Sequence, residues 1–220
     1  MIGVAVVTAR AGRLAPRPGV ALVALLAAIV AGCGEPRAAQ VGVGAGDPGG
    51  YQLAFEESGG EAVLGTPSGP VSRWAFGCRQ LFEGGRSGAA ALMQQPCGAN
   101  RQVFGVTGDF WAFYASHGAE AAAVFGYPLG RQGFLRGGWR QPFGAGGSEG
   151  AYFMQRPGGR VHYLRGAILH RYLFEAGVEE QLGFPTSDPV TVAGDGVHQE
   201  FENGSLTMGG ERPTIWVPKR

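Results

Sequence analysis

The residues best suited to bind a ligand lie around position 140 of the chain. Trp139 and Arg140 follow Gly137 and Gly138. An indole offers a flat apolar face to the C–H surface of a sugar, and a guanidinium binds carboxylate or phosphate oxygens. Glycines, which lack a Cβ, let a ligand approach the backbone. The sequence therefore predicts a contact patch built on Trp139 and Arg140, together with the adjacent Gln141.

Three glutamines recur, each two residues before a phenylalanine. They are Gln80, Gln141 and Gln199, followed by Phe82, Phe143 and Phe201. In a strand, residues two apart share a face, so each phenylalanine should pack in the core beside its glutamine. The glutamines either line a polar pocket for the ligand or are buried and satisfy the carbonyl groups of turns. Both interpretations are open at this point.

One short motif and several carboxylates could support catalysis. Residues 146–150 match the Gly-x-Ser-x-Gly elbow of hydrolases, which needs a strand before Ser148 and a helix after it. Glycines precede this serine, however, and the strand-like run 151–154 follows it. No spacing fixes two carboxylates at the separation that glycoside hydrolysis needs. The candidates are Asp109, Asp188, Asp195, Glu179 and Glu180. We therefore expect a protein that is not an enzyme.

We predict no cofactor and no metal site. Gly44, Gly46 and Gly49 have the spacing of a dinucleotide-binding fingerprint, but Pro48 and the composition of the segment leave no flanking strand and helix. The four histidines lack the i, i+4 pairing of a helical metal site, and the sequence has no Cys-x-x-Cys.

The composition excludes several classes of protein. The 18 basic and 17 acidic residues give a formal net charge of +1, which is not the charge balance of a nucleic-acid-binding protein. The 41 glycines and 14 prolines predict many turns, whereas 45% hydrophobic residues are too many for a disordered chain. We expect one folded domain over residues 51–220.

The first 32 residues have the pattern of an export signal. Three arginines precede the apolar run 20–31, which is too short to span a membrane. The run ends in Val30-Ala31-Gly32-Cys33, which resembles the lipobox of bacterial lipoproteins. The resemblance implies acylation of Cys33 and an anchor on the outer face of the cell membrane. An ordinary secretory peptide is the alternative. Residues 33–50 would then form a flexible tether, since they are small and lack aromatic side chains.

Two cysteines remain after Cys33. Cys78 and Cys97 are 19 positions apart in a chain that we expect to reach an oxidising compartment, so a structural disulfide is predicted. A metal site is the weaker alternative, because no second pair of metal ligands accompanies them.

Three segments share the pattern apolar-Gly-x-Pro. They are residues 64–67, 125–128 and 182–185, with prolines 61 and 57 positions apart. Because the three Gln-x-Phe motifs follow at a nearly constant distance, the register predicts three repeat units, at about 51–97, 98–158 and 159–220.

Each unit is predicted to hold a short helix, a Leu-Gly-x-Pro loop and a β-hairpin. Residues 168–176 have the apolar spacing of a two-turn helix that Gly177 can terminate. Asn203-Gly204 is a strong hairpin signal between strands at 197–202 and 205–208. Such a unit cannot bury its own apolar face, so three of them should pack as one pseudo-symmetric α+β domain.

The third unit is similar to the LGFP repeat of actinobacterial envelope proteins. The similarity rests on Leu182-Gly183-Phe184-Pro185-Thr186-Ser187-Asp188 and on Gln199-x-Phe201-x-Asn203-Gly204-Ser205. Units 1 and 2 depart from the pattern, with Thr66 and Tyr127 in place of the phenylalanine of the tetrapeptide. The resemblance implies a non-catalytic module that binds arabinogalactan or peptidoglycan in the cell wall. We therefore expect an exported lipoprotein that tethers the membrane to wall polysaccharide. The alternative is an envelope adaptor that binds a protein partner, such as a wall-modifying enzyme.

Overall fold

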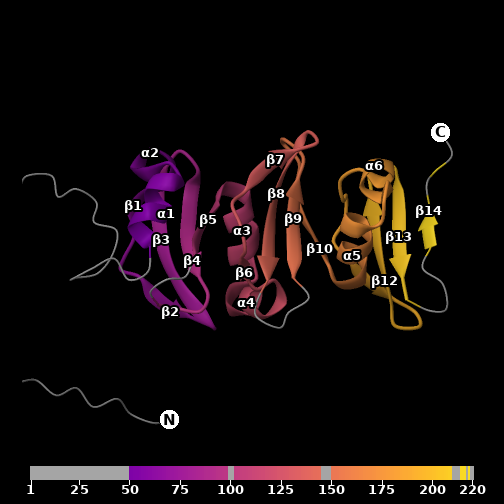
Figure 1. Ribbon diagram of the computed structural model, residues 1–220, viewed down its shortest axis with the longest axis horizontal. Helices are drawn as coiled ribbons and strands as arrows, with labels where there is room; N and C mark the ends of the chain where they lie inside the picture. The colour runs from indigo at the N-terminus through magenta and orange to yellow at the C-terminus, as the bar shows by residue number, and fades with distance from the viewer. Residues whose placement is uncertain (1–49, 99–101, 145–149, 210–213, 217, 219–220) are drawn as a thin grey trace, which may run out of the picture. The chain divides into compact units, whose positions relative to one another are not determined.

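A computed structural model describes residues 50–98, 102–144, 150–209, 214–216 and 218. Residues 37–220 form one compact unit. Short helices and antiparallel sheets alternate along it, which confirms the predicted α+β class (Figure 1). The predicted signal peptide, Cys33 and the tether up to residue 49 lie outside the described residues and stay predictions.

The chain builds three antiparallel sheets in succession. The first has the strand order β1-β3-β4-β5, with β2 paired to β3, and the second has the same pattern in β6-β8-β9-β10, with β7 paired to β8. The third sheet has the order β11-β12-β13-β14. The strands of the first sheet are β1 (Gly65–Pro67), β2 (Ser72–Trp74), β3 (Gly77–Gly85), β4 (Gly88–Gln94) and β5 (Val103–Thr107). Those of the second are β6 (Tyr127–Pro128), β7 (Gly133–Leu135), β8 (Gly138–Gly144), β9 (Ala151–Gln155) and β10 (Val161–Arg165). Those of the third are β11 (Val190–Val192), β12 (Gly196–Phe201), β13 (Gly204–Met208) and β14 (Thr214–Trp216).

Two short α-helices precede each sheet. They are α1 (Tyr51–Glu57) and α2 (Gly60–Leu64), then α3 (Gly108–Ser116) and α4 (Ala121–Val124), then α5 (Gly166–Phe174) and α6 (Val178–Leu182). A single 3₁₀ turn, η1 (Gly118–Glu120), joins α3 to α4. We call each helix pair with its following sheet a module, so that modules 1, 2 and 3 are residues 51–107, 108–165 and 166–216.

The predicted composition of a unit, one helix and one hairpin, was too simple. Each module has two helices, and Gly177, expected to end the first helix of module 3, is the N-cap of α6 with φ of 80°. Strand β5 pairs with β4 along its length, so the boundary between the first two modules falls after Thr107. Segments of five residues carry too little periodicity to be recognised as helices in advance.

One aromatic pair forms the centre of each module. A ring from the first helix stacks on a phenylalanine of the central strand, with centroids 5.4 to 5.6 Å apart. The pairs are Phe55–Phe82, Tyr114–Phe143 and Tyr172–Phe201. All three phenylalanines of the Gln-x-Phe motifs are buried, which confirms their predicted structural role.

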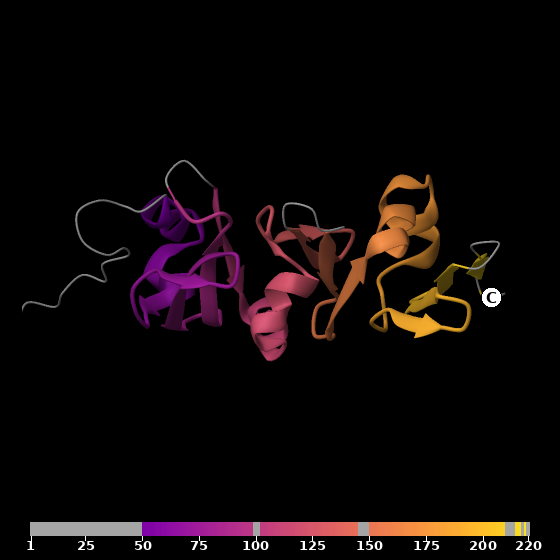
Figure 2. The same ribbon diagram turned by 90° about the horizontal axis from the view of Figure 1, so that it is seen from below.

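Helices α3 and α5 each pack between two sheets. One cluster joins Met93 of β4 to Trp111 and Tyr114 of α3 and to Phe153 of β9. A second cluster joins Met154 of β9 to residues of α5, α6 and the third sheet. Both views show α5 and α6 lying beside β12 and β13 (Figures 1 and 2). Successive modules therefore share their cores.

The apolar-Gly-x-Pro loops adopt the conformation that their glycines predict. Gly65, Gly126 and Gly183 have φ of 86°, 80° and 71°, which a residue with a Cβ rarely adopts. The hairpin of module 3 is also present, but one residue earlier than predicted. Phe201 pairs with Gly204, so the turn is formed by residues 202 and 203. This register is held by the loop, because the Asn203 N–H donates to the Leu182 carbonyl, 3.0 Å away.

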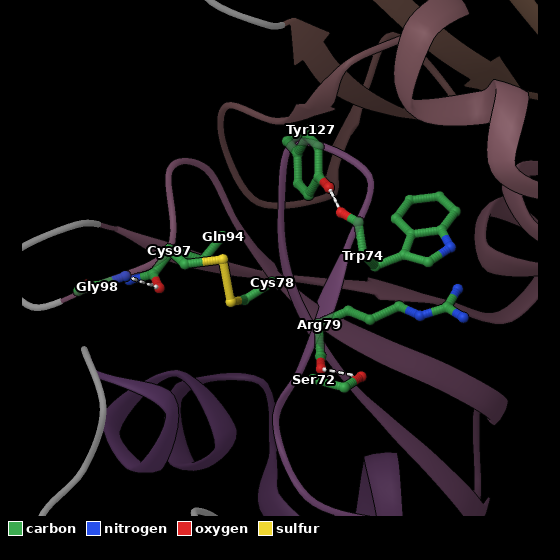
Figure 3. The surroundings of a disulfide bond; sticks show 8 residues. All are labelled: Ser72, Trp74, Cys78, Arg79, Gln94, Cys97, Gly98 and Tyr127. Carbon is green, nitrogen blue, oxygen red and sulfur yellow. Dashed lines mark hydrogen bonds between the residues drawn. A yellow bond between two sulfur atoms is a disulfide. The ribbon is translucent and has the colours of Figure 1, made fainter.

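The predicted disulfide is present. Cys78 at the start of β3 and Cys97 beyond β4 have their Cα atoms 5.2 Å apart and share a bond. Figure 3 shows that Cys78 and the next residue, Arg79, project to opposite sides of the strand. The bridge closes the edge of the module 1 core, where both cysteines pack against the buried cluster around Phe82.

Candidate functional site

The described part of the chain has a hollow of about 470 Å³ lined by residues of modules 1 and 2. Its walls come from the end of α1, the turn between β3 and β4, strand β5, and the segment from β6 to β8. Thr107 and Trp139 both line it. The hollow is therefore built jointly by modules 1 and 2.

Trp139 supplies the aromatic surface of this site. The side chain is 39% exposed and lines the hollow. It pairs across β7 and β8 with Phe134, which is 54% exposed, and the ring centroids are 5.0 Å apart in an edge-to-face arrangement. Large aromatic side chains are usually buried, so an exposed, mutually supported pair is a feature that points to binding.

Polar side chains also line the hollow. Arg131 forms an ion pair with Glu57, and the Thr107 hydroxyl donates to Gln132 Oε1 at 3.0 Å. Arg86, in the turn between β3 and β4, is exposed at another wall. A ligand that enters would thus meet an indole face, two guanidinium groups and a side-chain amide.

The structure separates the residues that the sequence suggested as one patch. Trp139 and Arg140 are consecutive on β8 and so face opposite sides of the sheet. The Arg140 guanidinium lies 3.3 Å from Glu179 of module 3 and does not line the hollow. Arg140 is therefore a contact between modules, which strand alternation could have indicated beforehand.

The three glutamines are buried, each at most 1% exposed. The Nε2 group of Gln80 donates to the Gly69 carbonyl, that of Gln141 to Gly130, and that of Gln199 to Ser187, at 2.8 to 3.0 Å. Of the two interpretations, the structure thus shows buried glutamines that satisfy loop carbonyls. They do not line the hollow.

Two of these glutamines also join modules. The Gln141 amide donates to the Gly105 carbonyl of module 1, and the Gln199 amide donates to the Tyr163 carbonyl of module 2, each at 2.8 Å. Gln80 has no such second bond among the described residues. The amide N–H groups therefore hold the last strand of the preceding module in place.

The remaining tryptophans of the described part take structural positions. Trp111 is 7% exposed in the shared core. Trp74 lies under the Arg79 guanidinium, 4.4 Å from its ring centroid, and the Tyr127 hydroxyl donates to the Trp74 carbonyl (Figure 3). Burial raises the pKa of Tyr127 and lowers the pKa of Arg79. The side chain of Trp216 lies outside the described residues.

The carboxylates considered for catalysis have other partners. Asp109 accepts from Gln155, and Asp188 accepts from the Tyr163 N–H. Glu179 and Glu180 pair with Arg136. Asp195 sits at a turn with φ of 55°. Ser148 of the elbow-like motif lies outside the described residues.

The described residues show neither a membrane-spanning helix nor a cluster of metal ligands. Within the described ranges, no helix is long and apolar enough to cross a membrane, and no three His, Cys, Asp or Glu side chains are grouped as metal ligands. No protein-family model matches the chain, and no curated protein matches it. The function is therefore argued from the site itself.

Proposed function

We propose that the protein is an exported, lipid-anchored envelope protein that binds cell-wall polysaccharide, arabinogalactan or peptidoglycan, in the hollow beside Trp139. The observation that carries the proposal is the exposed Trp139–Phe134 pair at a polar hollow between two modules. Saccharide sites combine a flat aromatic face with planar hydrogen-bonding groups, and Trp139, Gln132 and the two arginines supply both.

The sequence supplies the cellular context of this proposal. Cys33 in its lipobox-like setting would anchor the chain, and residues 34–50 would hold the modules near the membrane surface. In this proposal the three modules are the three predicted repeat units, and the resemblance of the third to the LGFP repeat favours a wall ligand. Shared strand order in the first two sheets and the three stacked aromatic pairs support the interpretation of the modules as degenerate repeats.

Co-sedimentation with purified wall sacculi tests the proposal. Residues 37–220, the compact unit, should sediment with arabinogalactan-bearing sacculi, and Trp139→Ala should reduce the bound fraction at least fivefold. Phe76→Ala is the matched control, because Phe76 is 65% exposed but does not line the hollow. Equal retention of all three folded proteins would reject Trp139 as the site, and no retention would reject wall binding.

An adaptor role is the second candidate, favoured by one observation. Phe134 and Trp139 are exposed together, and a protein could cover the apolar surface that their rings form. Cross-linking on intact cells separates the candidates. One recurrent protein partner whose recovery is lost in Trp139→Ala, without any retention on sacculi, would favour the adaptor.

A further inference from the structure

Several hydrogen-bonding groups of the Trp139 hollow are paired within the protein. One carboxylate oxygen of Glu57 accepts from Arg131, and Gln132 Oε1 accepts from Thr107. The Ser87 hydroxyl donates to the Val63 carbonyl at 2.6 Å. The hydroxyls of Thr107 and Ser87 therefore have no hydrogen left to donate to a ligand.

Two other groups of the hollow, on Gln132 and Arg86, keep N–H donors for a ligand. Because Gln132 Oε1 is fixed by Thr107, the amide Nε2 of Gln132 keeps both of its hydrogens for a ligand. The Arg86 guanidinium forms no hydrogen bond or ion pair with any described residue, and it carries five N–H donors. The lining holds two arginines and one glutamate, so its formal charge is positive.

From the unpaired guanidinium, the free amide and the positive lining we infer that the hollow is selective for a saccharide unit bearing an anionic group, a carboxylate or a phosphate. The oxygens of a carboxylate or phosphate only accept hydrogen bonds, so they match the unpaired N–H donors of Arg86 and Gln132. Hydrogen bonds between an anion and a guanidinium are charge-assisted and therefore stronger than neutral ones. Arg86 and Gln132 hold the anion, while Trp139 packs on the sugar ring. The inference rests on the proposed function, and it names the class of sugar that this site takes.

The test compares matched acidic and neutral probes on residues 37–220. An α-1,4-linked galacturonic acid trimer is compared with its carboxyl-reduced galactose counterpart, which lacks the charge. Galactose 1-phosphate is compared with galactose, so that a preference for phosphate can be told from a preference for carboxylate. Binding is followed by the NMR signal of the Trp139 indole N–H, assigned with Trp139→Phe. At least one acidic probe should bind tenfold or more tightly than its neutral partner.

Two arginine variants locate the effect. Arg86→Gln should reduce the acid preference to less than threefold, whereas Arg160→Gln should leave it unchanged. Arg160 is an equally exposed arginine in a turn between two strands, but it does not line the hollow. Equal affinity for acidic and neutral probes would overturn the inference while leaving wall binding intact, as would an acid preference that survives in Arg86→Gln. Absence of any Trp139 shift with every acidic probe would also overturn it, and sedimentation with sacculi would then decide the proposed function separately.

Discussion

The ring of Phe184 lies directly against Gly138, where a Cβ atom on the glycine would come within 2.3 Å of the phenylalanine Cε1. Tyr127 has the same relationship with Gly77, at 2.5 Å. Both aromatic residues occupy the third position of an apolar-Gly-x-Pro loop, and both glycines begin a strand of the preceding module. The third side chain of the loop is therefore a contact between modules, which explains why module 1 can have the exposed Thr66 there.

Helix α1 carries a polar residue at a position where α3 has a core residue. Gln52 is exposed on α1 and hydrogen-bonded to Glu56, at the position that the buried Trp111 holds on α3. On β12, His198 contacts both Thr207 and Glu200, at 2.7 and 2.6 Å.

Gly138→Ala should destabilise the domain by about 1 to 3 kcal/mol, because the added methyl group overlaps the Phe184 ring and the Gln155 carbonyl. Chemical denaturation measures the free energy of unfolding. Gly133→Ala is the control, since a Cβ there has nothing within 4 Å, and it should change stability by less than about 0.5 kcal/mol. Equal stability of the two variants would contradict the close contact between Phe184 and Gly138.

Gln141→Leu should cost more stability than Gln80→Leu. Gln141 donates to two carbonyls, one of them in the preceding module, whereas Gln80 donates to one. Each buried carbonyl left without its donor costs about 1 to 3 kcal/mol, so the difference between the variants should be at least about 1 kcal/mol. Thermal unfolding of both variants checks this order, and the reverse order would show that Gln141 does not hold the modules together.

Stability should fall in acid partly through Glu202. The bidentate Arg156 pair, at 2.6 and 2.7 Å, is the main cause that lowers the pKa of Glu202, and the Phe184 N–H adds a hydrogen bond. A carboxylate with a lowered pKa stabilises the fold above its unfolded pKa of about 4.3, and this contribution is lost as pH falls through the lower folded value. Partial exposure limits the effect to about 1 kcal/mol.

Glu202→Gln isolates this contribution. The variant should be less stable than the native chain at pH 7, and the two should converge as pH falls to about 3. Glu61→Gln, at an exposed glutamate of α2, should run parallel to the native curve. A native-to-variant difference at pH 7 that persists undiminished at pH 3 would exclude the Arg156–Glu202 pair as its source.

Reduction of the Cys78–Cys97 bridge should lower stability by about 3 kcal/mol, the loop-closure value for a separation of 19 residues. Unfolding is measured with and without a thiol reductant. The Cys78→Ala/Cys97→Ala variant should have the same stability as the reduced protein, and the reductant should not change it. A native chain that is equally stable in both conditions would show that the bridge contributes nothing.

The sequence predicted local features of the fold, such as backbone conformation at glycines and the burial of single side chains. The glycine conformations at 65, 126 and 183 and the buried phenylalanines follow from the immediate neighbours of those residues, and the disulfide follows from the number of cysteines. The hairpin of module 3 was predicted one residue late, because the Asn203 N–H is held by Leu182 of the loop, a contact that local turn rules do not include.

Contacts between residues of different modules could not be predicted from local sequence rules. The second bonds of Gln141 and Gln199 join residues 36 positions apart, and the hollow combines residues from Glu57 to Trp139. Trp139 was singled out by residue type alone, whereas Arg86 and Gln132 gave no comparable signal. The interpretation of the modules as LGFP-like repeats stays a prediction.

Wall polysaccharide is proposed to bind in the hollow beside Trp139. The most direct test is NMR mapping of the binding site with solubilised wall fragments. Titration of residues 37–220 with an enzymatic digest of arabinogalactan-peptidoglycan should shift the Trp139 indole and the Gln132 side-chain amide signals first, with saturation. Shifts confined to signals of module 3, or no shift from a digest of sacculi that retain the protein, would contradict the assignment of this hollow as the glycan site.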